Sequence, residues 1–185
     1  MKILVSSLSI FIFTHTSFGI TLDTSKEVET ISKKYLGDPY VWGGVNPDTG
    51  MDCSGYTKYV FNKVGIKIPR TAYAQSRVGK DIDKVNLKKG DLLFFLTDKK
   101  RNIPITHVGI YLGNNKFIHA ASTKKGIIIS PFRGGSYEKK FVVAKRVINK
   151  QQQFKKNMYI TLDEEVLKSS MSIKITSFGG IHDTF

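Results

Sequence analysis

The chain has 185 residues, of which 41% are hydrophobic, so it can build one compact domain with its own core and is not disordered throughout. Its formal net charge of +14 creates a field that attracts polyanions. No helix-turn-helix, zinc finger or aromatic RNA-binding motif accompanies that charge, so we expect no nucleic-acid partner. An anionic polymer or membrane surface outside the cytoplasm is a better candidate for the partner of this positive charge. The alternative, that the lysines only keep the protein soluble, explains the charge about equally well.

Residues 1–19 have the pattern of a secretory signal peptide. Lys2 provides the positive start, Ile3 to Phe13 is mostly apolar, and Ser17 and Gly19 are small residues beside a cleavage point. The apolar run is shorter than the roughly 20 residues that span a bilayer, and a buried N-terminal strand is the alternative. We therefore expect an exported protein, periplasmic or secreted to the cell wall, with no transmembrane span in the mature chain.

Helical signals come first along the mature chain. Thr24 or Ser25 can cap a helix that runs to Tyr35, in which Val28 and Ile31 share one face. The pattern predicts that this face is buried.

A second helix is predicted to start after Asp52, a suitable N-cap, and to run through Val64 until Gly65 stops it. A short polar helix is predicted over residues 71–78.

Strand signals follow the helices. Five apolar runs, separated mostly by glycine, asparagine and lysine turns, cover residues 92–96, 107–112, 116–121, 126–129 and 141–148. Helices first and an antiparallel sheet second indicate an α+β fold with five or six strands. This domain is predicted over residues 20–150. Residues 151–185 form a C-terminal extension, either two strands around a short helix or a loosely ordered tail.

Cys53 is the only cysteine, and it lies where the second helix should begin. In an exported chain it cannot form an internal disulfide, so it is either an inert buried thiol or a reactive one. The first turn of a helix presents unpaired N–H groups and the positive end of the dipole, which stabilise a thiolate. The same N–H groups can receive the oxyanion of a tetrahedral intermediate. A cysteine nucleophile is the favoured interpretation.

Two histidines on neighbouring strands could serve this thiol, and their relation depends on the turn between them. A two-residue turn over 114–115 would put His107 and His119 on opposite faces. A three-residue turn over 113–115 would place His119 opposite Gly109 and diagonal to His107 on the same face. We predict the three-residue turn, and we expect a two-residue turn to break the contact. His107 would then act as base and His119 would orient it.

The same three side chains could bind zinc, but their spacing lacks any short pair and no strand carboxylate completes the shell. We therefore predict no metal and no cofactor. His182, in the extension, is interpreted as a structural residue.

Six ordered segments within residues 26–148 resemble the NlpC-type family of cell-wall cysteine peptidases: Pro39–Gly44, Asp52–Gly55, Ile68–Thr71, Lys89–Phe95, His107–Gly113 and Phe117–Ala120. The resemblance implies a papain-like α+β fold with permuted topology. It also implies hydrolysis of peptidoglycan stem peptides by a triad of Cys53 as nucleophile, His107 as base and His119 as third residue.

Further roles follow from the same resemblance. The hydroxyl of Tyr40 would lie near the oxyanion site, and Asp52 and Ser54 would help to bind a free stem-peptide amine. Arg70 would contact the substrate or hold the structure. The expected partner is a peptidoglycan stem peptide, and we expect a monomer. Residues 151–185 and the glycine-free turn residues 114–116 depart from the family pattern.

Two other functions are compatible with the same sequence. One is a related amidase or acyl-transfer enzyme that uses the same triad on another bond. The other is a peptidoglycan-binding module without activity. Which stem-peptide bond is cut depends on loops such as Thr97–Pro104 and Arg133–Lys139, whose shape the sequence does not reveal.

Overall fold

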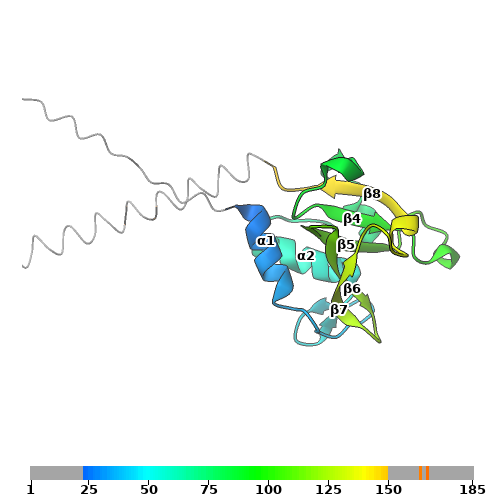
Figure 1. Cartoon of the computed structure of the whole chain (residues 1–185). Coiled ribbons are helices and arrows are strands. Elements are labelled where there is room, and N and C mark those ends of the chain that lie inside the picture. Colours follow the sequence, from blue (N-terminus) through cyan, green and yellow to red (C-terminus); the bar gives the residue numbers. More distant parts are fainter. Residues whose placement is uncertain (1–22, 150–162, 164–165, 167–185) are drawn as a thin grey trace, which may run out of the picture.

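The structure is a computed structural model that describes residues 23–149 together with Asp163 and Val166 (Figure 1). The predicted signal peptide lies outside the described residues. So does the predicted C-terminal extension, apart from those two residues.

The described chain forms short helices and antiparallel strands. In chain order they are α1 (Thr24–Lys33), β1 (Val45–Asn46), β2 (Gly50–Met51), α2 (Cys53–Lys63), α3 (Ala72–Gln75), β3 (Lys80–Ile82), η1 (Lys84–Asn86), β4 (Leu92–Phe95), η2 (Lys99–Arg101), β5 (His107–Gly113), β6 (Lys116–Ser122), β7 (Gly126–Pro131), η3 (Glu138–Lys140) and β8 (Phe141–Arg146).

The first helix begins slightly earlier than predicted. Asp23, rather than Thr24 or Ser25, is the N-cap of α1, and its carboxylate accepts a hydrogen bond from the Ser25 N–H at 2.9 Å. An aspartate satisfies the unpaired N–H groups of the first turn and complements the helix dipole. Val28 is fully buried and Ile31 partly so, as their spacing predicts.

The second helix has the predicted boundaries, and these boundaries position Cys53. Asp52 is the N-cap of α2, Cys53 is its first residue, and Gly65 follows the C-cap with a φ of 80° that favours glycine. The predicted helix over 71–78 is shorter, because α3 covers only residues 72–75 after its N-cap Thr71.

Six strands of the described chain form one antiparallel sheet in the order β3-β8-β4-β5-β6-β7, which confirms the predicted α+β class and the expected five or six strands (Figure 1). The strand at one edge, β3, and the small β1–β2 hairpin were not predicted. Both are short, and β1 and most of β3 are exposed, so neither has an apolar run to mark it. Within the described residues, no helix has the length and apolar character needed to cross a bilayer.

The sheet buries side chains on both of its faces. Helices α1 and α2 lie together beside it (Figure 1), and α2 packs on β5 and β6. Leu92 and Phe94 of β4 join the core cluster that contains α2, whereas Leu93 and Phe95 join a second, aromatic-rich cluster. A strand buried on both faces reads as a continuous apolar run, which is why β4 is so clear in the sequence.

The hairpin between β5 and β6 differs from the prediction. Its turn has two residues, Asn114 and Asn115, with φ of 49° and 59°, and Gly113 pairs with Lys116. The predicted three-residue turn is therefore wrong. Two consecutive left-handed residues make the turn that matches strand twist, and asparagine tolerates this conformation better than most residues.

A β-bulge preserves the predicted register despite the shorter turn. The pairing shifts between Tyr111 and Gly113, so Leu112 is the extra residue and Tyr111 lies opposite Phe117. Continued along the strands, this register keeps His107 and His119 on one face. The expectation that a two-residue turn would separate them is wrong, because the bulge supplies the residue that the turn lacks.

Candidate active site

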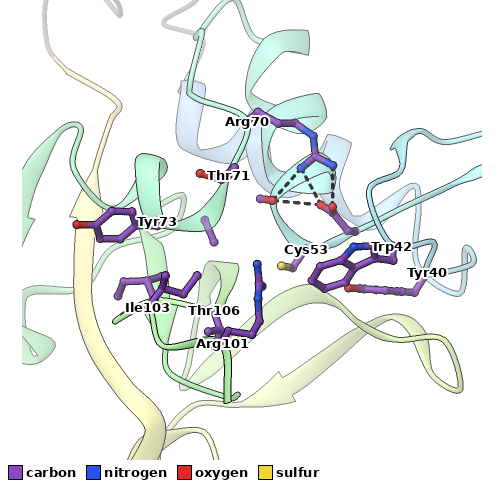
Figure 2. A pocket seen from close by; sticks show the side chains of 13 residues that line it. Tyr40, Trp42, Cys53, Arg70, Thr71, Tyr73, Arg101, Ile103 and Thr106 are labelled. Atoms are coloured by element: carbon purple, nitrogen blue, oxygen red, sulfur yellow. Dashed lines mark hydrogen bonds and ion pairs between the residues drawn. The ribbon is translucent and has the colours of Figure 1, made fainter. Parts of the chain in front are cut away.

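An open cleft of about 440 Å³ lies at the N-terminal end of α2 (Figure 2). It contains five of the predicted site residues, namely Tyr40, Asp52, Cys53, Ser54 and Arg70. Other residues complete its lining: Trp42, Thr71, Ala72, Tyr73, Arg101, Ile103, Ile105 and Thr106.

One wall of the cleft is held by the carboxylate of Asp52. One oxygen accepts hydrogen bonds from the Gly55 N–H at 2.7 Å and from the Ser54 hydroxyl at 3.1 Å. The other accepts from the Gly43 N–H at 3.1 Å. Arg70 donates to both oxygens, at 3.0 and 2.7 Å, in a bidentate pair (Figure 2). The turn that carries Cys53 is thus tied to two other segments of the chain.

In this wall the negative charge of Asp52 is compensated by the positive charge of Arg70. Burial acts to raise the pKa of Asp52, but the hydrogen bonds from Arg70 and Gly55 outweigh it and hold that pKa below its usual range. Arg70 also donates to the Ser54 hydroxyl at 2.9 Å. The carboxylate and the guanidinium therefore stay ionised together at neutral pH.

Cys53 lies at the base of the cleft with 8% of its surface exposed. Burial and the nearby Asp52 carboxylate raise the pKa of its thiol to about 11, although the N–H groups of Val108, Ser54 and Cys53 itself act to lower it. The thiol is therefore neutral at neutral pH. The N–H groups around the sulfur stabilise negative charge when it forms there.

The two predicted histidines are in direct contact. The Nε2 atom of His107 lies 2.8 Å from the Nδ1 atom of His119, and both side chains are buried. The Nε2 atom of His119 in turn lies 3.0 Å from the Oγ atom of Ser130. Ser130 pairs with Phe117 across β6 and β7, so it reaches His119 diagonally, in the same way that His119 reaches His107.

Burial keeps this histidine pair (His107 and His119) neutral. It lowers the pKa of His107 to about 4, with a smaller contribution from Lys140. It lowers the pKa of His119 to about 2, with contributions from His107 and Lys125. A neutral imidazole keeps one lone pair, so each ring can accept a proton or a hydrogen bond at one nitrogen.

Aromatic rings enclose the histidine pair. Tyr137 stacks on His107 with 6.0 Å between ring centroids and meets His119 edge-on at 4.9 Å. Phe117 stacks on the other ring, that of His119, at 4.5 Å. Gly109 makes room for this packing, because a Cβ atom there would lie 2.6 Å from the Phe117 ring and 3.0 Å from the Cβ atom of His119. The rings therefore have little freedom to turn.

The sulfur and the histidine pair are connected through the start of β5 and through Tyr137. Tyr137 stacks on His107, and burial and the nearby Cys53 raise the pKa of its hydroxyl. The described lining of the cleft includes neither His107 nor His119.

Thr106 lines the cleft, His107 follows it, and the N–H of Val108 is directed at the sulfur. Within residues 23–149 no hydrogen bond joins the sulfur to His107. The Nε2 atom of His107 is occupied by His119, which leaves Nδ1 as the nitrogen that can serve the thiol. Contacts of this kind commonly form only when substrate is bound.

Tyr40 lies on the cleft side of the sulfur (Figure 2). Burial, Cys53 and Asp52 raise the pKa of its hydroxyl to about 12, while Arg101 and Arg70 act in the opposite direction. Tyr40 is therefore a neutral hydrogen-bond donor at neutral pH. It lies near the sulfur, where the carbonyl oxygen of an attacked substrate would become an oxyanion.

Several residues of this site were missed by sequence reasoning. Arg101 and Ile103 come from the Thr97–Pro104 loop and Tyr137 from the Arg133–Lys139 loop, which the sequence marked only as loops on which the choice of stem-peptide bond depends. Ser130 could have been found from strand alternation, had the register of β6 and β7 been known. Among the described residues, no group of three or more His, Cys, Asp or Glu is arranged to hold a metal ion.

Comparison with known proteins places this geometry in a family. The model of the NlpC/P60 family matches residues 37–146, which include the cysteine and both histidines. The chain belongs to the NlpC/P60 family. This confirms the resemblance inferred from the six ordered segments.

Relatives with described activities share the same region. The chain is 42% identical over 122 residues to "Bifunctional muramidase/DL-endopeptidase CwlT" of Bacillus subtilis, a match that covers 64% of this chain and 36% of the relative. It is 36% identical over 126 residues to "Murein DD-endopeptidase MepS/Murein LD-carboxypeptidase" of Escherichia coli, which covers 64% of each protein.

A solved structure of an NlpC/P60 family protein from Bacillus cereus matches with a TM-score of 0.63 and 34% identity. That match covers 68% of this chain and 40% of the other chain. This chain therefore spans about two fifths of the length of these Bacillus relatives.

Proposed function

We propose that this protein is a cysteine endopeptidase that hydrolyses peptide bonds in peptidoglycan stem peptides or their cross-links. The observation that carries the proposal is the position of Cys53, the first residue of α2, at the base of an open cleft. The N–H of Val108, the residue after His107, is directed at its sulfur, and Tyr137, which stacks on His107, lies close to it. The names of the relatives, which describe endopeptidases of the cell wall, support the substrate class.

The proposed reaction begins with a neutral thiol and a neutral imidazole. His107 takes the thiol proton at Nδ1 as the sulfur attacks the carbonyl carbon of the scissile bond. The C–N bond then breaks, and the imidazolium returns that proton to the leaving amine. His107 then takes a proton from water as the water oxygen attacks the thioester. The C–S bond breaks, the imidazolium returns the proton to the sulfur, and the new carboxylic acid leaves and ionises in water.

The raised pKa of the Cys53 thiol and the lowered pKa of His107 both disfavour a thiolate–imidazolium pair before substrate binds. Proton transfer is therefore coupled to the attack of the sulfur.

In this mechanism His119 and Ser130 are positioning residues that choose the tautomer of the base. When His119 donates from Nε2–H to the Ser130 oxygen, its Nδ1 atom accepts from the Nε2–H of His107. The lone pair of His107 is then at Nδ1, which is the state that a base requires. The opposite arrangement of protons would leave His107 unable to accept.

Two donors are proposed to stabilise the oxyanion. The backbone N–H of Cys53 points at the sulfur region from the helix N-terminus, and the neutral hydroxyl of Tyr40 lines the cleft beside it. Donors that are already in place before the reaction lose little free energy to reorganisation.

The predicted substrate-binding set, Asp52, Ser54 and Arg70, is proposed to have two tasks. The carboxylate of Asp52 already accepts five hydrogen bonds, so its main task is to hold the turn that presents Cys53. The oxygens of this carboxylate and the hydroxyl oxygen of Ser54 are also the acceptors that can receive a free stem-peptide amine, whereas Arg70 is a donor only and holds Asp52 in place.

We infer that the protein acts outside the cytoplasm, because peptidoglycan lies there and residues 1–19 have the pattern of a signal peptide. The formal charge of +14 would draw the enzyme to an anionic wall.

The test is to incubate residues 20–185, the chain without the predicted signal peptide, with purified peptidoglycan sacculi and to identify soluble products by mass spectrometry. Fragments that require Cys53 should appear with the native chain and be absent with Cys53→Ala. The variant changes one atom in a helix that it should leave folded, and circular dichroism provides that control. Release of the same fragments by Cys53→Ala, or products that reveal no broken peptide bond, would contradict the proposal.

A further inference from the structure

Two arginines line the cleft, and their surroundings differ. Arg70 is neutralised by the bidentate carboxylate of Asp52. Arg101, which lies across the cleft from it (Figure 2), forms no ion pair with any carboxylate within residues 23–149. No side-chain hydrogen bond from its guanidinium is formed within that part of the chain either. Arg101 therefore brings an uncompensated positive charge to the cleft that contains the thiol.

The guanidinium of Arg101 is nonetheless held in place by an aromatic ring. Its central carbon lies 4.9 Å from the ring centroid of Trp42, within the range of a cation–π contact. Trp42 is 68% exposed, so the pair stands at the open edge of the cleft rather than in the core. A guanidinium stacked on a ring keeps its N–H donors free at its edges, where they match the two oxygens of a carboxylate.

The loop that carries Arg101 is anchored at its base. The hydroxyl oxygen of Thr106 accepts hydrogen bonds from the N–H of Thr97 at 2.8 Å and of Asp98 at 3.0 Å. Asp98 caps the short helix η2 by accepting from the Lys100 N–H at 3.0 Å. Because both ends of the loop are joined to each other, Arg101 is presented to the cleft with a reduced entropic cost of ordering on binding.

The charges of the cleft wall point to the kind of group that this arginine receives. Asp52 and Arg70 cancel each other, so Arg101 gives the part of the lining that residues 23–149 provide a net charge of about +1. Stem peptides contain a D-glutamate that is linked through its γ-carboxyl, so its α-carboxylate is free unless it has been amidated. That carboxylate is an anion of the right shape for a bidentate contact.

We propose that Arg101, stacked on Trp42, is a carboxylate-binding subsite that recognises the free α-carboxylate of γ-linked D-glutamate and thereby disfavours the amidated form. This inference rests on the proposed function, because it assumes a stem-peptide substrate. It assigns the choice between acid and amide to the loop between β4 and β5, not to the wall that holds Cys53.

The experiment measures binding and cleavage separately, using residues 20–185, the chain without the predicted signal peptide. Two peptides of L-alanine, γ-linked D-glutamate and L-lysine are compared, one with the α-carboxylate and one with the α-carboxamide. Titration calorimetry with the Cys53→Ala chain should give a dissociation constant about tenfold lower for the acid than for the amide. In Arg101→Met, made in the same background, that ratio should fall towards one.

Matched variants separate the subsite from general charge. Lys100→Met removes the same charge from the neighbouring residue, which does not line the cleft, and should leave the acid-to-amide ratio unchanged. Arg101→Lys keeps the charge but loses the planar fork, so it should retain only part of the preference. A ratio near one in the parent chain, a ratio unaffected by Arg101→Met, or no measurable binding of either peptide would overturn the subsite.

Two further arms distinguish the sources of failure. Replacing L-lysine by diaminopimelate adds a third carboxylate to those of D-glutamate and of the C-terminus, and an Arg101-dependent preference that follows this group instead would overturn the assignment to D-glutamate. Cleavage of sacculi by the native chain is read in parallel. Cysteine-dependent fragments with an acid-to-amide ratio near one would refute only the subsite, whereas acid-selective binding without any cleavage would refute only the proposed activity.

Discussion

The sulfur and the histidine pair belong to two different hydrophobic clusters of the same sheet. Cys53 lies in the cluster formed around α2, together with Val108 of β5. His107 and His119 pack among the aromatic rings of the other cluster, against Phe95 and Phe117. The proposed nucleophile is therefore positioned by a local cap, and the proposed base is positioned by the register of several strands. The two halves of the site depend on different kinds of structure and can be damaged independently.

The largest effect is expected on the histidine side. His107→Ala should lower the rate of fragment release from sacculi by about 100- to 10,000-fold, since a positioned general base contributes this much. Initial rates with native and variant chains measure the loss. Because His107 is buried, His107→Gln is the better-packed second variant, and near-ultraviolet circular dichroism shows whether the aromatic cluster is intact. A folded variant with activity within tenfold of the native chain would contradict the role of His107 as base.

An effect of intermediate size is expected on the sulfur side. Burial and Asp52 raise the thiol pKa from 9.0 to about 11, so the thiolate fraction at pH 7 should be about 100-fold smaller than in an unperturbed cysteine. The rate of alkylation by iodoacetamide should be correspondingly low and should rise about tenfold per pH unit until pH 11 is approached. The chain unfolded in urea is the control.

The alternative state would give the opposite profile. A resting thiolate–imidazolium pair would be alkylated rapidly, with a rate that is nearly constant between about pH 5 and 8. That result would show that proton transfer precedes attack, and it would contradict the neutral resting state.

The smallest effect is expected at the far end of the histidine pair. Ser130→Ala removes the hydrogen bond that selects the tautomer of His119, so kcat should fall by roughly tenfold or less while KM stays nearly constant. Ser130→Thr, which keeps the hydroxyl, should restore most of the activity. Fragment release from soluble muropeptides gives both constants. Equal losses in the alanine and threonine variants would indicate a packing role instead.

Local signals explain why much of the fold could be predicted. Asp52, Cys53 and Gly65 mark both ends of α2 through capping chemistry that involves only neighbouring residues. The apolar runs of β4 to β8 are likewise visible without knowledge of their partners. By contrast, β3 is short and mostly exposed, so only its pairing with β8 reveals it.

The candidate site divides along the same line. The cleft position of Cys53 follows from its place at the N-terminus of a helix. The contact between His107 and His119 depends instead on a β-bulge that no single residue type predicts. Ser130, Tyr137 and Arg101 could not be predicted, because each enters the site through strand pairing or loop shape at long sequence separation.

The bulge at Leu112 also bears on how this hairpin can change in length during evolution. Since Leu112 is the unpaired residue, a chain that lost it would retain the pairing of Gly113 with Lys116 and of Tyr111 with Phe117. A single-residue deletion normally moves the side chains of a strand to the opposite face of the sheet. Deletion of Leu112 would instead remove only the bulge and leave both imidazoles on the same face. Its cost would fall on packing, through the loss of the buried Leu112 side chain, and the chemistry would be inherited unchanged.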